Sequence, residues 1–265
     1  RWIIPTMSFI VHAKRHEEHF LMPKIISYIL FLCYVVIDWR IIIMPLPMQR
    51  LVLGLRERYC KPINIKQNST EMTILHISDT HNLHHKITSP LISKADILIH
   101  SGDITNNGTE QEVLDFLNWF ISLPNAHKIF VTGNHDTCLL DAEKIDDLPE
   151  NVHFLQDSSV SIGGTTFFGL GYSHDEMLIP GGIDFLITHE PPIMILDKSS
   201  GVHWGNIKIR NRVQEIKPKY HLFGHAHEGY GIKKIGSTFY SNATLMNDKM
   251  ELVNEPRRII FSLKI

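Results

Sequence analysis

Five short apolar runs recur along the chain, and each stops at residue types that bind metal ions. The runs are rich in Ile, Leu, Val and Phe and end at polar or glycine-marked turns, which is the pattern of buried strands. They cover Thr73–Ser78, Ala95–His100, Lys128–Thr132, Asp184–Thr188 and Tyr220–Phe223. The pattern therefore predicts five buried strands, each followed by a polar loop.

Two segments with a period near 3.6 predict helices. Thr109 and Glu112 form a capping-box pair, apolar residues then recur at helical spacing over Val113–Ile121, and Pro124 ends the run. A second helix is predicted over Ile207–Ile216. The late part of the chain reads as strands. The pattern by itself predicts a fold of mixed α and β structure.

The loops after the five predicted strands contain carboxylates, imidazoles and one amide. Loops at one edge of a sheet converge, so side chains that are far apart in the sequence can form one site. This collection of side chains is typical of sites for two divalent metals. The residues are Asp79, His81, Asp103, Asn134, His135, Asp136, His189, His225 and His227. The pattern predicts a dinuclear metallohydrolase.

The order of these motifs resembles the calcineurin-like metallophosphoesterase superfamily. The series Asp-x-His, Gly-Asp, Gly-Asn-His-Asp, a lone His and Gly-His-x-His spans residues 73–265. Between these motifs, Gly102–Val113, Thr188–Pro192 and Pro218–Gly231 are similar to the metallophosphoesterase-domain-containing branch, which includes small phosphodiesterases. The resemblance implies an α/β (α+β) fold with four layers, in which a two-sheet β-sandwich is flanked by helices.

The resemblance also implies the metal ligands. One metal ion is expected on Asp79, His81, Asp103 and His227, and a second on Asp103, Asn134, His189 and His225. Asp103 would bridge the pair, because each of its two oxygens can face one ion. Manganese, iron and zinc all accept such mixed ligands, so the sequence leaves the identity of the metal ions open.

The expected chemistry is attack of activated water on a phosphate ester. Metal ions lower the pKa of bound water to about 7. His135 is the candidate general acid for the leaving group, and Asp136 is expected to orient its ring. Two divalent ions, two aspartates and a hydroxide leave one positive charge, which suits a phosphodiester anion.

The predicted function is hydrolysis of small, cyclic-nucleotide-like phosphodiesters. Two alternatives stay open: a protein or nucleotide phosphomonoesterase that uses the same dinuclear site, and a non-catalytic nucleotide-binding protein. The short segment Tyr172–Gly182 replaces a longer loop of the branch, so substrate preferences transfer poorly.

Other histidines are assigned no catalytic role. Those beside strands are predicted to be structural, while three others lie in loops that are either solvated or close to the pocket. The first group is His76, His100, His127, His153 and His221, and the second is His84, His85 and His203.

Composition sets limits on partners and location. The net charge of the 265 residues is −2, so no long nucleic acid is expected as a partner. The odd number of cysteines, 3, predicts neither a disulfide framework nor a thiolate zinc site. A cytoplasmic protein acting on a small phosphate-ester substrate is the simplest expectation.

The first 71 residues differ from the rest. Ile25–Ile37 is an uncharged apolar run, which is too short to cross a bilayer, and Asp38 and Arg40 interrupt its continuation through Ile41–Met44. We expect residues 1–71 to be a hydrophobic extension that is not needed for catalysis, and residues 72–265 to be the catalytic domain. Membrane association through residues 25–44 is the alternative.

Overall fold

The computed structural model describes residues 11–13 and 71–262. Contacts divide the chain into a unit of residues 1–14 and 65–265 and a second unit of residues 15–64. The second unit, including the apolar run Ile25–Ile37, lies outside the described residues, so the boundary at residue 72 stays a prediction. None of the helices formed by the described residues has the length and apolar character of a membrane span.

The first sheet carries three of the predicted motif strands. Its strand order is β15-β2-β3-β4-β6. Strands β2, β3, β4 and β6 run parallel, and β15 pairs antiparallel with β2. Their bounds are β2 Glu71–Ile77, β3 Ile97–His100, β4 His127–Phe130, β6 Val152–Phe154 and β15 Arg257–Ser262.

The second sheet carries the other two motif strands. Its order is β13-β14-β12-β9-β8-β7, in which β14, β12, β9 and β8 run parallel. The edge strands β13 and β7 pair antiparallel with their neighbours. The bounds are β7 Ser158–Ile162, β8 Thr165–Gly169, β9 Phe185–Ile187, β12 Tyr220–Phe223, β13 Gly231–Ile235 and β14 Thr238–Asn242.

The remaining strands form small ladders, and short 3-10 turns connect the larger elements. Strand β1 (Val11–Ala13) pairs with β5 (Ala142–Ile145), and β10 (Lys198–Ser199) pairs with β11 (Val202–His203). The 3-10 turns are η1 His84–Lys86, η2 Ile92–Lys94, η3 Thr137–Leu139, η4 Glu176–Leu178 and η5 His227–Gly229.

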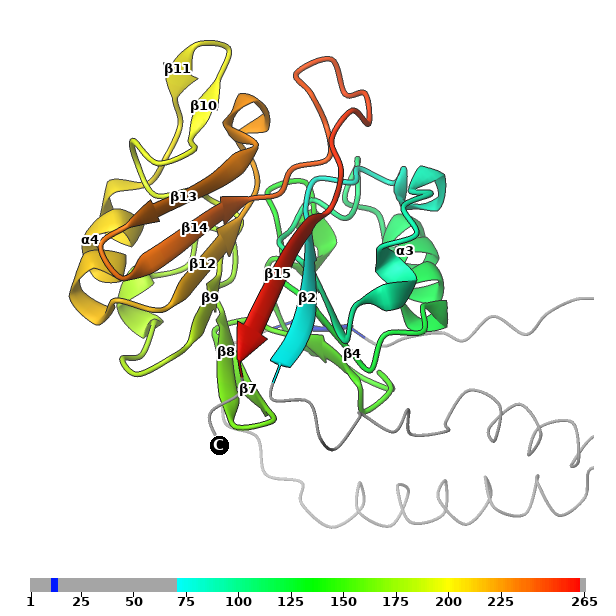
Figure 1. The fold of residues 1–265 in the computed structure, drawn as a ribbon. Helices are drawn as coiled ribbons and strands as arrows, with labels where there is room; N and C mark the ends of the chain where they lie inside the picture. Colours follow the sequence, from blue (N-terminus) through cyan, green and yellow to red (C-terminus); the bar gives the residue numbers. More distant parts are fainter. Residues whose placement is uncertain (1–10, 14–70, 263–265) are drawn as a thin grey trace, which may run out of the picture. The chain divides into compact units, whose positions relative to one another are not determined.

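Three apolar cores separate four layers. One core lies between the sheets and includes Ile74 of β2 and Phe185 of β9. A second packs helix α3 (Glu110–Ser122) on the outer face of the first sheet. A third packs helix α4 (Ile207–Ile216) on the outer face of the second sheet. Figure 1 shows the two sheets between these helices, which confirms the predicted four-layer sandwich.

Both predicted helices are present. The Thr109 side chain accepts a hydrogen bond from the Glu112 amide at 3.3 Å, and the Glu112 carboxylate accepts one from the Thr109 amide at 3.1 Å. This confirms the capping box. The buried face of α3 also includes Phe116. The second helix has the predicted bounds, with Asn206 as its N-cap.

The parallel strands explain where the site forms. Strands β2, β3 and β4 are parallel neighbours in one sheet, and β9 and β12 are parallel neighbours in the other. Parallel neighbours end at the same edge of their sheet, so the loops that follow them lie together. Each of the five loops begins with one of the predicted motifs.

Candidate metal centre

The backbone of the motif loops is unusual. Asp79, His81, Asp103 and His225 have φ angles of 54°, 39°, 56° and 65°, in the left-handed region that few residues other than glycine adopt. The loops are joined by hydrogen bonds from the amides of Thr80 and His81 to the carbonyl oxygen of Asp103, at 3.0 and 3.1 Å. Backbone strain of this kind gathers at functional sites.

Asp103 lies at the centre of the site. Its Oδ2 atom is 3.5 Å from Nε2 of His81 and 3.3 Å from Nε2 of His189. Its Oδ1 atom accepts a hydrogen bond from the backbone amide of His135 at 2.9 Å. A ligand from the first sheet and a ligand from the second therefore lie at the same oxygen of Asp103, whereas the expectation was one oxygen for each ion, because the second oxygen accepts from the His135 amide.

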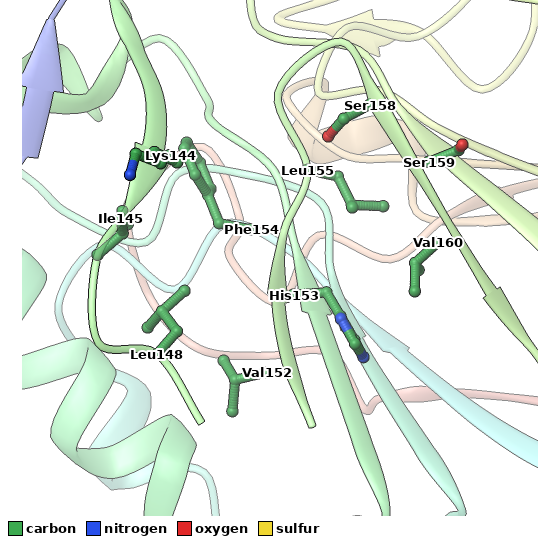
Figure 2. A pocket seen from close by; sticks show the side chains of 10 residues that line it. All are labelled: Lys144, Ile145, Leu148, Val152, His153, Phe154, Leu155, Ser158, Ser159 and Val160. Atoms are coloured by element: carbon green, nitrogen blue, oxygen red, sulfur yellow. The ribbon is translucent and has the colours of Figure 1, made fainter. Parts of the chain in front are cut away.

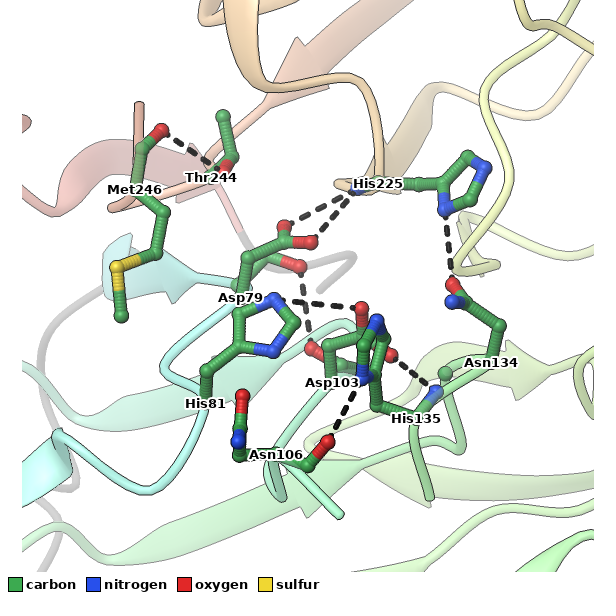
Figure 3. A network of polar contacts seen from close by, with 12 residues as sticks. Asp79, His81, Asp103, Asn106, Asn134, His135, His225, Thr244 and Met246 are labelled. Atoms are coloured by element: carbon green, nitrogen blue, oxygen red, sulfur yellow. Dashed lines mark hydrogen bonds and ion pairs between the residues drawn. The ribbon is translucent and has the colours of Figure 1, made fainter. Parts of the chain in front are cut away.

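Asp79 and Asn134 each contact the Gly-His-x-His loop. Nε2 of His227 is 3.6 Å from Oδ1 of Asp79, and the amide of His225 donates to the Asp79 carboxylate at 3.1 Å. Oδ1 of Asn134 lies 2.9 Å from Nδ1 of His225 and 3.0 Å from Nε2 of His189. Figure 3 shows that Asp79, Asp103 and Asn134 point into one region.

Backbone carbonyls fix the tautomers of two of these histidines. Nδ1 of His189 lies 2.8 Å from the carbonyl oxygen of Ser101, and Nδ1 of His227 lies 3.1 Å from that of Asn247. A carbonyl oxygen only accepts, so each Nδ1 carries hydrogen and each Nε2 of a neutral ring has a free lone pair. Metal-binding histidines commonly have such partners.

The two buried aspartates, Asp79 and Asp103, favour a positively charged group beside them. Burial alone would raise the pKa of Asp79, but hydrogen bonding to His227 and the neighbouring imidazoles hold it well below its usual value. Burial alone would lower the pKa of His189, yet the carboxylate of Asp103 raises it to about 10. This pocket therefore stabilises a cation, either a proton on His189 or a metal ion that displaces it.

Burial favours the neutral form of two other histidines, which is the form that binds metals. Burial lowers the pKa of His225 to about 4 and also lowers that of His81. Neither ring nitrogen of His81 has a hydrogen-bond partner among the described residues, although the side chain is buried. Such unpaired polar atoms are costly unless they bind something. The donor set thus fits divalent metal ions.

The potential ligand atoms gather in overlapping groups. Atoms within 4.8 Å of one another are contributed by Asp79, His81 and His227 in one group and by Asp79, Asp103 and His189 in another. A third group consists of His81, Asp103 and His135. With Asn134 and His225 attached through hydrogen bonds, the structure brings together all seven residues that the sequence assigned as ligands.

Comparison with known proteins places the chain in a family. The model of the family described as calcineurin-like phosphoesterase matches residues 72–229. The chain belongs to this family. A UPF0046 protein of Caenorhabditis elegans is 34% identical over 251 residues, which cover 78% of this chain and 88% of that protein. Human metallophosphoesterase domain-containing protein 1 is 35% identical over 227 residues, which cover 68% of each chain.

A solved structure supports the fold assignment alone. It matches with a TM-score of 0.50 at 14% identity and covers 72% of this chain and 100% of the other. Identity at that level carries no statement about the reaction. The family match together with the cluster of donors supports a metal-dependent phosphoesterase.

Glycines of the family motifs are needed because the loops approach closely. A Cβ atom at Gly133 would lie 2.2 Å from both the amide nitrogen and Oδ1 of Asp103. A Cβ atom at Gly224 would lie 2.2 Å from Oδ2 of Asp79. Real Cβ atoms do not come so near, so only glycine lets these loops pass behind the two aspartates.

His135 lies at the site, but the partner of its Nδ1 atom is a backbone carbonyl and not the predicted Asp136 carboxylate. The ring of His135 is 4.6 Å from that of His81, and its Nδ1 is 2.8 Å from the carbonyl oxygen of Asn106. Asp136 instead accepts hydrogen bonds from the amide of Gly133 at 2.8 Å and the hydroxyl of Thr105 at 2.8 Å. The hypothesis that Asp136 orients the ring of His135 is therefore corrected, because this buried carboxylate ties two loops together.

Histidines predicted to be structural have structural partners. His76 bridges the hydroxyls of Ser241 and Ser101 at 3.0 and 2.9 Å, and His221 lies 2.9 Å from the hydroxyl of Thr188. His100 contacts the hydroxyl of Thr80 at 3.0 Å. The remaining pair, His127 and His153, contact each other at 3.3 Å.

The sequence did not reveal several residues around the centre. Tyr172 lies beside His189 and His225, with ring centroids 5.9 and 6.3 Å away. Asn106 and Asn247 act through backbone carbonyls. A carbonyl is present in every residue, so no sequence signal would have identified these two.

Two cavities differ in their relation to the centre. One of about 450 Å³ opens at the metal-ligand candidate His227. It is lined by His227, Glu228, Tyr230, Asn247, Asp248, Lys249, Val253 and Asn254. The other, of about 320 Å³, lies around Phe154 and His153 and includes none of the predicted ligands (Figure 2). Of these two, only the first adjoins the candidate metal centre.

Proposed function

We propose that this chain is a phosphodiesterase that hydrolyses small phosphodiesters with two bound divalent metal ions. The position of Asp103 between His81 of one sheet and His189 of the other carries the proposal. Asp79, His81 and His227 would hold one ion, Asn134, His189 and His225 the other, and Asp103 both. Bound ions would supply a Lewis acid for water and phosphate.

The chain supplies the proton that the leaving group needs. The Asn106 carbonyl keeps hydrogen on Nδ1 of His135, so Nε2 is the atom that gains and gives up a proton. Protonated His135 can pass that proton to a departing alkoxide. A positioned acid of this kind typically contributes about 10²–10⁴-fold in rate.

The charge of the ligand set favours a singly charged substrate. It contains two carboxylates, with neutral imidazoles and one amide as the other donors. Two divalent ions would leave a small positive excess at the site. A phosphodiester carries one negative charge, whereas a monoester dianion is held better by additional cations.

The cavity beside His227 supports a small substrate. Its volume of about 450 Å³ is in the usual range for small-molecule sites. Tyr230 and Val253 offer apolar surface, while Asn254 and Lys249 offer polar contacts. Glu228 and Asp248 add two carboxylates, so the cavity is suited to the organic part of a substrate and not to its phosphate. Such a lining suits an organic group attached to the phosphate, for example a nucleoside.

The decisive experiment compares diester and monoester hydrolysis. Protein loaded with Mn²⁺ is assayed with a bis-aryl phosphate, the matching mono-aryl phosphate, and 2′,3′- and 3′,5′-cyclic nucleotides. We expect faster turnover of the diesters, and at least a 100-fold loss of kcat/KM in Asp103→Asn, since even residues that only support a metal ligand typically contribute about 10–100-fold.

The control is Asp141→Asn, which changes an exposed carboxylate and should leave the rate unchanged. Preference for the monoester would favour a phosphomonoesterase. Binding of a nucleotide without turnover of either ester would favour a non-catalytic protein. Unchanged diester hydrolysis in Asp103→Asn would refute the proposed centre.

A further inference from the structure

A second group of metal-binding side chains lies on η1 and α3. Nε2 of His84 and Nε2 of His85 are each 3.2 Å from the same atom, Oδ2 of Asp115. The potential ligand atoms of these three residues lie within 4.8 Å of one another. None of them belongs to the seven ligands of the phosphoesterase centre.

The burial of His84 distinguishes this group from an ordinary surface pair. Its side chain is 0% exposed, while those of His85 and Asp115 are 56% and 45% exposed. The ring packs against Phe116 and Trp119 at centroid distances of 5.6 and 5.0 Å. These contacts hold the imidazole in place with Nε2 directed at Asp115.

His84 also lacks the hydrogen bonds that a buried imidazole usually has. Nδ1 has no hydrogen-bond partner among the described residues, and Nε2 has only the Asp115 carboxylate, 3.2 Å away. Burial lowers the pKa of His84 to about 4, so the ring is neutral at physiological pH. A neutral ring forms no ion pair with Asp115, but it is the form that binds metals.

We propose that His84, His85 and Asp115 form a further metal site, for a divalent cation of the zinc type. Two imidazoles and one carboxylate are typical zinc ligands and leave the fourth tetrahedral position to water. Copper, nickel and cobalt accept the same donors. The bound ion would join η1, just after the Asp-x-His loop, to helix α3.

The test measures zinc bound to the full chain by equilibrium dialysis and metal analysis. His85→Ala and Asp115→Asn should each bind one zinc ion fewer than the unaltered protein. Loss of one of three ligands should weaken binding at this site by at least about 100-fold, since supporting residues alone typically contribute about 10–100-fold. His203→Ala and Glu110→Gln, which change an exposed histidine and an exposed carboxylate, should bind as much zinc as the unaltered protein.

A second measurement addresses the site directly. Zinc should slow the modification of His85 by diethyl pyrocarbonate, followed by mass spectrometry, and Asp115→Asn should abolish that protection. In Asp103→Asn, which alters only the phosphoesterase centre, the protection of His85 should persist. Equal zinc content in all variants, or unprotected His85 at saturating zinc, would overturn the proposal.

Discussion

At the residue scale, the site depends on which atom of each side chain is free to react. The carbonyls of Ser101 and Asn247 leave Nε2 of His189 and His227 for a metal ion. The same device, from Asn106, leaves Nε2 of His135 for a proton. In all three histidines a backbone carbonyl therefore occupies Nδ1 and leaves Nε2 free. The position of each ring then decides whether Nε2 binds a metal ion or transfers a proton.

The role of His135 can be tested through the leaving group. We expect His135→Ala to reduce kcat by about 10²–10⁴-fold for diesters with an alkoxide leaving group, which must be protonated. For a nitrophenolate leaving group, which departs without a proton, the loss should be much smaller. The measurement is kcat for both substrate types, together with metal content, which should not change.

An equal loss for both leaving groups would contradict the general-acid role. A parallel loss of metal would instead show that His135 acts as a ligand, as its place near His81 and Asp103 allows.

At the scale of elements, strands and tight loops bring the ligands together. Parallel strands in each sheet end side by side, and the loops after β2, β3 and β4 cross within hydrogen-bonding distance. Such close crossings leave no room for a side chain at Gly133. The loop after β4 thus supports Asp103 as well as supplying Asn134.

Gly133→Ala tests this close approach. The added methyl group would meet the backbone and carboxylate of Asp103 at 2.2 Å, so the loop or the carboxylate must move. We expect a loss of about 1–3 kcal/mol in the free energy of unfolding, as overpacking typically costs, and loss of bound metal. Denaturant unfolding and metal analysis measure both.

The matched control is Gly181→Ala, where an added Cβ atom would have no neighbour within 4 Å. It should match the unaltered protein in both measurements. If Gly133→Ala bound as much metal as the unaltered protein, the close approach of Gly133 to Asp103 would not be needed for metal binding, and the prediction would be wrong.

At the scale of the whole molecule, neither sheet contains a complete site. Loops of the first sheet supply Asp79, His81, Asp103 and Asn134, and loops of the second supply His189, His225 and His227. The apolar core between the sheets holds these two half-sites together. Metal binding and sandwich packing are therefore coupled, since ions that bind only the folded protein stabilise it.

Acid should destabilise this molecule through its buried neutral histidines. Burial lowers the pKa of His221 from 6.5 to about 3, and it lowers the pKa values of His76 and His100 to about 3 as well. Between these values the unfolded chain binds protons that the folded chain does not. The free energy of unfolding should thus fall as pH falls from about 6.5 to 3, by up to about 1.4 kcal/mol per pH unit for each histidine.

Denaturant unfolding at several pH values checks this with His221→Gln, which should give a shallower dependence on pH. Thr188→Val removes the partner of His221 but keeps the imidazole, so it should retain the original dependence. The same slope in His221→Gln and the unaltered protein would contradict this assignment.

The sequence by itself determined the strands, the caps and the order of the ligands. Thr109 and Glu112 predicted the start of α3 because a capping box is a local interaction. The apolar runs predicted the buried strands because a central strand is covered on both faces, so the side chains on both faces must be apolar. These features depend on residues that are close together in the chain, so they can be read without coordinates.

Only the tertiary structure decided which groups meet. It showed that the carbonyl of Asn106, and not Asp136, orients the ring of His135. It also placed His84 and His85 against Asp115. Contacts of this kind join distant segments and often involve a backbone carbonyl, which has no signature in the sequence. The physical reason is that packing of whole sheets and helices, rather than local preference, sets the distances between such groups.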